Sequence, residues 1–368
     1  MKDLQSFGWY AARISPNLPK KAFKPVPERL WGGLAFLAVV ITGMLIIGFL
    51  NLAIWGNLLI ALVLGASFAS MGFLGHEILH GTVVRKPWLR EILGAIFLWP
   101  LSTGPKLWRE WHNLSHHVHT QDADQDPDAF PTLEQFLREP VLRRLYRLPF
   151  WVRSLLGFLS LSVTFTYHSL NMFFRFLKEF GPQKQPIVWM QLLLPWGTWI
   201  GLLVWMGPVK WLFAFVIPLL IANFIVMAYI ATNHRLNPLV PVNDPLANSL
   251  SVTVPRWVNV LHFNFSYHTE HHIFPGMSSK YYPMVKQQIL HMWPDRYHEM
   301  PLGRALLSLW KTPRIYYNQT ELIDPHIGNV YGSLGHGLDP ANITPRKIGI
   351  PVNQNCSHDT SAEHTQTH

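Results

Sequence analysis

The chain has 368 residues, of which 49% are hydrophobic and only 14% are charged, and it contains 16 tryptophans. Soluble domains carry about 25% charged residues, so this composition excludes an ordinary soluble protein and indicates an integral membrane protein. A formal net charge of +9 would suggest a nucleic-acid partner for a soluble chain. Beside long apolar segments it is better explained by Lys and Arg held on the cytoplasmic side of a membrane, and we expect no nucleic-acid partner.

Four apolar segments are long enough to cross a hydrocarbon core, which takes about 20 residues. The first two are joined by a few uncharged residues around Asn51, and the last two are separated by Gly207-Pro208. We therefore predict two hairpins of spanning helices, formed by residues 31–50, 53–75, 187–206 and 209–231. The apolar stretches 92–101 and 150–174 are too short or too interrupted by polar residues to span, and are expected at the membrane interface.

The loops inside each hairpin carry at most one Lys, whereas the N-terminal segment and the middle of the chain are rich in Arg and Lys. This asymmetry predicts that both termini and the long middle region are cytosolic. The expected fold is an all-α, multi-pass membrane protein with four transmembrane helices and a cytosolic helical cap over a dimetal site. Its predicted parts are a cytosolic segment 1–30, hairpin 31–75, cap 76–186, hairpin 187–231, cap 232–325 and a flexible tail 326–368.

The first of three histidine clusters is His76-Glu77-Ile78-Leu79-His80, at the predicted end of the second span. Positions i and i+4 of a helix share a face about 5–6 Å apart, so the two imidazoles can meet at one metal ion. The same motif is the signature of zinc proteases, in which the histidines bind zinc and the glutamate is the general base. The motif alone leaves both interpretations open.

Two further clusters follow in the cytosolic segments, with the spacings HxxxHH (His112, His116, His117) and HxxHH (His268, His271, His272). On an ideal helix the three histidines of the last cluster fall within an arc of about 100°, so they can share a site. By the same count His117 lies about 140° from His112. Either that helix is distorted or the cluster serves two metals on different sides, and we favour two metals.

His234, at the cytosolic end of the fourth span, is a natural ninth histidine. Nine imidazoles are too many for one ion, so their number favours a dinuclear centre, although imidazole binds iron, zinc, copper and nickel alike. A metal-bound histidine normally donates its second ring N–H to a carboxylate or carbonyl. Four carboxylates near the clusters are therefore candidates for this supporting role: Glu77, Glu110, Asp126 and Glu270.

The order HxxxH, HxxxHH and HxxHH, with one helical hairpin between the second and third clusters, resembles the membrane fatty acid desaturase superfamily, which includes hydroxylases and carotenoid oxygenases. The resemblance covers about residues 30–285. It extends to Asp126-Pro127-Asp128, to TNHRLNP at 232–238 and to HTEHHIFP at 268–275.

This resemblance implies two iron ions that activate O2 with two electrons and remove hydrogen from an unactivated carbon of a lipid chain. The implied ligands are His76, His80, His112, His116, His117, His234, His268, His271 and His272. In relatives an asparagine that acts through water precedes the additional histidine, which draws attention to Asn233. Cluster order and the interval of 32 positions from His80 to His112 favour an acyl-lipid or acyl-CoA desaturase, with a lipid or carotenoid hydroxylase or ketolase as the alternative.

Two other classes fit the sequence less well. An intramembrane zinc protease would need an acidic ligand on a later span, yet these spans contain no Asp or Glu, and seven histidines would remain unexplained. A metal transporter would place ionisable ligands near the middle of the bilayer. His119 and His262 lie near the clusters and are expected outside the ligand set, and the isolated His168 is expected to be structural or solvent-exposed.

The source of electrons is expected to be a separate protein. The sequence shows no cysteine cluster for an iron–sulfur centre and no flavin-type Gly-rich loop after a strand. A ferredoxin or a b-type cytochrome would supply the two electrons, and the basic cap suits an acidic partner.

Overall fold

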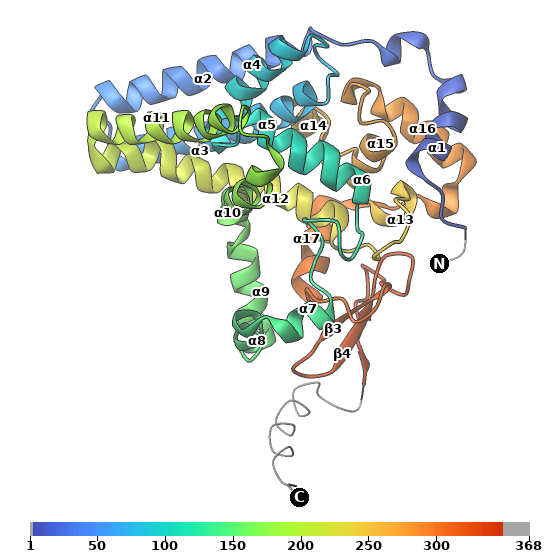
Figure 1. The fold of residues 1–368 in the computed structure, drawn as a ribbon. Coiled ribbons are helices and arrows are strands. Elements are labelled where there is room, and N and C mark those ends of the chain that lie inside the picture. The colour runs from blue at the N-terminus through green and yellow to red at the C-terminus, as the bar shows by residue number, and fades with distance from the viewer. Residues whose placement is uncertain (1–2, 349–368) are drawn as a thin grey trace, which may run out of the picture.

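The computed structural model describes residues 3–348, which are mostly helical. Three segments are long and apolar enough to cross a membrane: Arg29–Phe49, Ile54–Leu79 and Gln185–His234. The third is not one continuous helix, because Gly207 takes a φ of 77°, a left-handed value that glycine adopts without strain. Four long helices result and lie side by side (Figure 1): α2 (Arg29–Phe49), α3 (Ile54–Leu79), α11 (Gln185–Trp211) and α12 (Ile217–His234).

The turns of the two hairpins lie together at one end of this bundle. The Nζ atom of Lys210 donates a hydrogen bond of 2.9 Å to the carbonyl of Gly48, and the rings of Phe49 and Trp205 pack edge to face. Along the bundle α3 packs directly on α12, where a side chain at Gly65 would lie 2.6 Å from Ile221. Because α3 and α12 both start at the turn end, they bring their histidines to the opposite end.

That opposite end carries a cap of shorter helices and loops (Figure 1). A π-helical segment, Arg109–His116, continues α5 and leads into α6. The cap helices are α1 (Phe7–Ile14), α4 (Pro87–Leu98), α5 (Pro105–Trp108), α6 (His117–His119), α7 (Leu133–Arg138), α8 (Pro140–Leu145), α9 (Phe150–Leu159), α10 (Leu161–Phe176), α13 (Pro245–Asn248), α14 (Arg256–Leu261), α15 (His268–Ile273), α16 (Tyr282–Met292) and α17 (Leu302–Lys311).

The two stretches expected at the interface are helical, and part of the second one does not run parallel to the bundle. Residues 92–101 fall in α4 and the 3₁₀ turn that follows it, and residues 150–174 are divided between α9 and α10. Helix α9 is apolar but has only ten residues, too few to cross a bilayer. It runs across the direction of the four long helices (Figure 1).

Two small sheets depart from the expected all-helical fold. Strands β1 (Ser251–Thr253) and β2 (Glu299–Pro301) pair in parallel. Strands β3 (Glu321–Asp324), β4 (Asn329–Gly332) and β5 (Arg346–Lys347) form an antiparallel sheet.

This second sheet corrects the expectation of a flexible tail that begins at residue 326. Gly328, with a φ of 70°, permits the tight turn between β3 and β4, and its N–H bonds the carbonyl of Asp324 at 2.9 Å. Ile323 and Val330 then pack on Phe136 of α7. Burial of these alternating apolar residues against α7 explains why this polar-looking segment is structured. Residues 349–368 of the expected tail lie outside the described part of the chain.

Candidate metal centre

Five histidines from three parts of the chain converge at the cap end of α3. They are His76 and His80 of α3 and its C-terminus, His112 of the π-helical segment, His117 of α6 and His271 of α15. One ring nitrogen of each lies within 4.8 Å of the others. The Nε2 atom of His112 is 3.0 Å from that of His76 and 3.1 Å from that of His117, which in turn is 3.0 Å from Nε2 of His271. We call these residues the five-histidine group.

The remaining four predicted ligands meet beside it. One ring nitrogen each of His116, His234 and His272 lie within 4.8 Å of one another. His268 joins them, because its Nε2 atom is 2.6 Å from Nε2 of His234 and 3.1 Å from Nε2 of His272. We call these residues the four-histidine group. The structure thus brings together all nine histidines singled out in the sequence, in two adjacent groups.

The π-helical segment explains how one short motif serves both groups. The N–H of His117 bonds the carbonyl of His112 five residues earlier, instead of the residue four earlier as in an α-helix. This wider turn brings His117 onto the same side as His112, while His116 contributes to the other group. The helix is therefore distorted, as one explanation of the 140° offset required, and the cluster also contributes to two histidine groups, which the explanation by two metals requires.

The geometry fits a pair of metal ions. Two nitrogens bound to one ion at about 2.1 Å lie about 3 Å apart, which is the spacing found between the Nε2 atoms. The buried Nε2 atom of His80 has no hydrogen-bond partner among the described residues, as expected of a nitrogen that faces an ion. Burial, reinforced by the neighbouring imidazoles, lowers the pKa of five cap histidines and favours the neutral, metal-binding form: His112, His117, His268, His271 and His272.

The second ring nitrogens of several histidines are held by groups around the centre. The Nδ1 atom of His234 lies 3.1 Å from the carbonyl oxygen of Asn248, and that of His271 lies 3.0 Å from the hydroxyl of Tyr282. The Nδ1 atom of His272 lies 3.3 Å from Oγ1 of Thr120. These contacts fix the orientation of each ring, so that Nε2 faces the centre.

His116 is oriented by a carboxylate, as proposed for Asp126 from the sequence. Its Nδ1 atom lies 3.0 Å from Oδ1 of Asp126 and 3.4 Å from a carboxylate oxygen of Asp128. Burial alone would lower the pKa of His116, but the negative charge of Asp126 raises it to about 9. When Nδ1–H of His116 donates to Asp126, the Nε2 atom of the same ring faces the other three histidines of its group.

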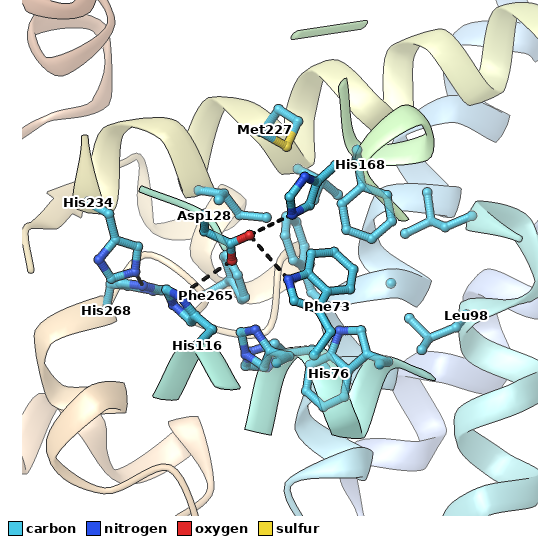
Figure 2. Close-up of a pocket in the computed structure, with 18 of the residues that line it drawn as sticks. Phe73, His76, Leu98, His116, Asp128, His168, Met227, His234, Phe265 and His268 are labelled. Atoms are coloured by element: carbon cyan, nitrogen blue, oxygen red, sulfur yellow. Dashed lines mark hydrogen bonds and ion pairs between the residues drawn. The ribbon is translucent and has the colours of Figure 1, made fainter. Parts of the chain in front are cut away.

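Asp128 and His168 form a link that the sequence analysis missed. The Nε2 atom of His168, on α10, lies 2.7 Å from Oδ1 of Asp128, and the indole N–H of Trp111 donates to the same oxygen at 3.1 Å (Figure 2). Burial would raise the pKa of Asp128, but the hydrogen bond from His168 and the charge of His116 lower it. The two residues are 40 positions apart, and the only available signal was the Asp126-Pro127-Asp128 motif.

Within residues 3–348, the carboxylate of Glu77 forms no hydrogen bond or ion pair with a histidine. This carboxylate pairs with Arg29 at 2.9 Å and accepts hydrogen bonds from the hydroxyl of Ser278 at 2.6 Å and the N–H of Ser279 at 3.1 Å. It therefore ties α3 to the N-terminal end of α2 and to the segment that follows α15. These contacts also engage both oxygens of the group that would have to act as the general base of a zinc protease.

The other supporting candidates are placed differently. Glu270 accepts hydrogen bonds of 2.6 Å from Ser251 and Tyr297, and Oγ of Ser251 accepts the N–H of His268, so this carboxylate steadies the start of α15. Burial raises the pKa of Glu270. Glu110 forms no hydrogen bond or ion pair within the described chain, and the amide of the fully buried Asn233 has no partner there either.

The two histidines placed outside the ligand set remain outside both groups. His119 lies on α6 and belongs to neither of them. His262 brings its Nδ1 atom to 2.9 Å from the hydroxyl of Tyr229.

A largely apolar pocket adjoins both histidine groups, with His76, His112, His116, His234 and His268 in its wall (Figure 2). The rest of the lining comes from α3, α4 and the turn after it, α5, the π-helical segment, α10, α12 and nearby loops, and includes Phe73, Leu98, Trp111, Phe165, Val226 and Met227. The chemistry of this lining suits an alkyl group next to the histidine nitrogens.

Comparison with known proteins agrees with this geometry. The sequence model described as "Fatty acid desaturase" matches residues 53–303. The chain is 24% identical to an sn-1 oleoyl-lipid 12-desaturase of Anabaena variabilis, over 86% of this chain and 90% of the relative. It is 23% identical to a chloroplastic omega-6 fatty acid desaturase of Spinacia oleracea, over 82% of this chain and 69% of the relative. The chain therefore belongs to the fatty acid desaturase family and is an oxidoreductase.

Proposed function

We propose that this protein is an O2-dependent di-iron desaturase that introduces a double bond into the acyl chain of a membrane lipid. The observation that carries the proposal is the position of two imidazole groups, of five and four histidines, beside one apolar pocket. The relatives whose names specify lipid-linked acyl chains support an acyl-lipid substrate.

Each group would hold one iron ion, and together the irons would supply the redox chemistry that couples O2 and two electrons to the removal of two hydrogens. In balanced form, a –CH2–CH2– unit, O2, two electrons and two protons give –CH=CH– and two waters. The five-histidine and four-histidine groups would bind the metals through the Nε2 atoms of their imidazoles. Asp126, Asp128, Tyr282 and Thr120 keep the rings in position, and the pocket excludes bulk water from the alkyl chain.

The proposed setting is a multi-pass membrane protein with four spans, α2, α3, α11 and α12. Lys and Arg favour the cytosol for the cap, the active site and both termini. Since the histidines lie at the cap end of α3 and α12, the oxidised carbon would lie near the cytosolic face of the bilayer. An acyl chain can enter such a site from the membrane without leaving an apolar environment.

Two electrons would come from a separate protein, a ferredoxin or a b-type cytochrome. The net charge of +9 supports an acidic partner, because opposite charge speeds association and selects orientation.

The test is expression of the full chain in a host with a simple lipid profile, followed by mapping of double bonds in its fatty acids. We expect new unsaturation from the wild type and none from His271→Ala, although that variant should still insert in the membrane. New hydroxylated or keto products without new double bonds would instead support a lipid or carotenoid hydroxylase or ketolase. Purified protein should hold two iron ions per chain, and stoichiometric zinc without iron would overturn the proposal.

A further inference from the structure

A second pocket, distinct from the one beside the histidines, lies between α8, α9 and the segment that follows α17. It has a volume of about 380 Å³. Its wall includes the apolar side chains of Leu142, Leu145 and Phe150 and also the polar ends of Arg153, Arg314 and Tyr146. The volume falls in the range of about 300–1,000 Å³ that is usual for ligand sites.

Arg314 is a cation without a counter-ion in this pocket. Arg153 is paired with Asp324, whereas the guanidinium of Arg314 forms no ion pair and no hydrogen bond within residues 3–348. Burial, with help from the charge of Arg235, lowers the pKa of Arg314 to about 10, so the group stays protonated at neutral pH. The Arg314 side chain is half-buried, so an anion bound beside it would replace part of the hydration that the guanidinium has lost.

A glycine on α9, Gly157, leaves space for the side chain of Arg314. A Cβ atom at Gly157 would lie 2.1 Å from one guanidinium nitrogen of Arg314 and 2.4 Å from another. Only glycine therefore leaves room for the guanidinium where it lies. The hydroxyl of Tyr146 accepts the backbone N–H of Arg314 at 3.1 Å, and its own proton has no acceptor among the described side chains. The pocket thus offers an O–H donor next to a guanidinium.

The outer face of residues 148–159 is apolar and exposed, as expected of a helix at a membrane surface. Leu148, Trp151, Leu155 and Leu159 follow one another at helical spacing, and all are exposed, Trp151 by 65%. Helix α9 lies across the long helices (Figure 1), which is the orientation of an amphipathic helix that rests on a bilayer. An exposed apolar stripe in this orientation would contact acyl chains of the cap-side leaflet.

The surroundings carry more positive than negative charge. Arg143 and Arg144 on α8 and Arg147 just after it form no ion pair in the described part of the chain, and the buried Nε of Arg143 has no hydrogen-bond partner there. Basic residues beside an apolar stripe favour lipids with negatively charged headgroups.

We propose that this pocket binds the headgroup phosphate of an anionic membrane phospholipid, between the guanidinium of Arg314 and the hydroxyl of Tyr146. The acyl chains of the lipid lie along the apolar wall of the pocket, while the exposed stripe on the opposite face of α9 rests on the bilayer. The inference rests on the membrane placement in the proposed function. It concerns binding, which needs neither metal nor electron donor.

The site lies close to the pocket beside the metals. Phe130 lines the phospholipid pocket, and Asp128, two residues earlier, lines the metal pocket. The guanidinium of Arg235 stacks on the ring of Phe130 at 4.8 Å from the metal side. The two pockets are therefore linked by the contact of Phe130, in the wall of one, with Arg235, in the wall of the other.

The test is native mass spectrometry of the full-length protein in detergent, titrated with phosphatidylglycerol or with phosphatidylcholine of the same acyl composition. We expect phosphatidylglycerol to bind about tenfold more tightly than phosphatidylcholine, because both lipids offer a phosphate but the quaternary ammonium of choline offsets its charge and is repelled by the guanidinium of Arg314. Arg314→Gln should abolish this preference. Gly157→Ala should abolish it too, because the added methyl displaces the guanidinium while its charge remains. Arg138→Gln is the matched control, since Arg138 pairs with Glu134 on the surface of α7.

Retained iron and an unchanged unfolding temperature in lipid-free detergent would show that the variants are folded. Equal affinity for both lipids, or an undiminished preference in Arg314→Gln and Gly157→Ala, would overturn the proposal. Displacement of the lipid by millimolar inorganic phosphate would also overturn it, because the site would then recognise free phosphate. A chain that shows the lipid preference but makes no double bonds would refute the desaturase function and leave the lipid site standing.

Discussion

His112 and His117 hold their Nε2 atoms 3.1 Å apart although five residues separate them in the chain. In an α-helix the same two positions would point about 140° apart. The π-helical segment is equivalent to an α-helix with one additional residue in a turn, so positions i and i+5 become neighbours. The wider π-helical turn takes up the one extra residue of the HxxxHH motif. Its three histidines therefore point in the directions that an HxxHH motif has on a regular α-helix.

This equivalence predicts an unusual tolerance to deletion. Leu114 is 52% exposed and lies within the π-helical segment. We expect a chain that lacks Leu114 to relax to a regular α-helix and to retain both metals, as measured by iron content after purification. Insertion of an alanine after Leu114 should rotate His116 and His117 away from their groups and lower the iron content. The opposite order of the two variants would show that the π-helix is needed for another reason.

Single histidine changes should affect the two groups separately. His271 belongs to the five-histidine group and His272 to the four-histidine group. We expect His271→Ala and His272→Ala each to retain about one iron per chain after exposure to a mild chelator, and to lose desaturase activity. His119→Ala should retain both ions, since its ring belongs to neither group. Loss of both irons from each variant would mean that the groups bind metal only as a unit.

His168 should tune metal retention without binding metal. It is one of the donors that hold Asp128, whose carboxylate in turn lies 3.4 Å from Nδ1 of His116. Loss of such an outer contact typically weakens metal binding about 10–100-fold, so His168→Leu should lose iron to a chelator at least tenfold faster than the wild type. His168→Gln keeps an N–H donor and should restore much of the retention. Equal rates in all three proteins would reduce this contact to simple packing.

The Arg29–Glu77 pair should contribute to stability more than exposed pairs do. The side chains of Arg29 and Glu77 are 16% and 7% exposed. Glu77→Ala would leave the partly buried Arg29 without a counter-ion, although it keeps hydrogen bonds to Phe263 and Ser279, and should cost about 1.5–3 kcal/mol. Glu134→Ala, which breaks an exposed pair on α7, should change stability by less than about 0.5 kcal/mol. Equilibrium unfolding in detergent would compare the two, and equal losses would contradict the structural role of Glu77.

The sequence was sufficient for the histidines because their spacing reflects local helix geometry. His76 and His80 share a face through helical periodicity alone, and cluster order placed the other members. The helix break at Gly207-Pro208 could also be predicted, since these residues interrupt a long apolar stretch.

Contacts between segments far apart in the chain could not be predicted from the sequence. Asp128 meets His168 only because α10 packs against the loop after the second cluster. Glu77 looked like a partner for a histidine, and its contacts with Arg29 and Ser278 depend on how α2 and the segment after α15 dock on α3. The β3–β4 hairpin was not predicted either, because its apolar residues pack on α7, almost 200 positions earlier in the chain.

Helix α15 has only six residues, yet it supplies His271 to one group and His268 and His272 to the other. During synthesis, α3, the π-helical segment and α12 all leave the ribosome before it does. Until α15 has docked, the nascent chain holds an incomplete set of imidazoles at both positions. A complete set of imidazoles for two metal ions therefore exists only after this short helix, which is synthesised after the long helices, has docked, and one short helix completes both groups together.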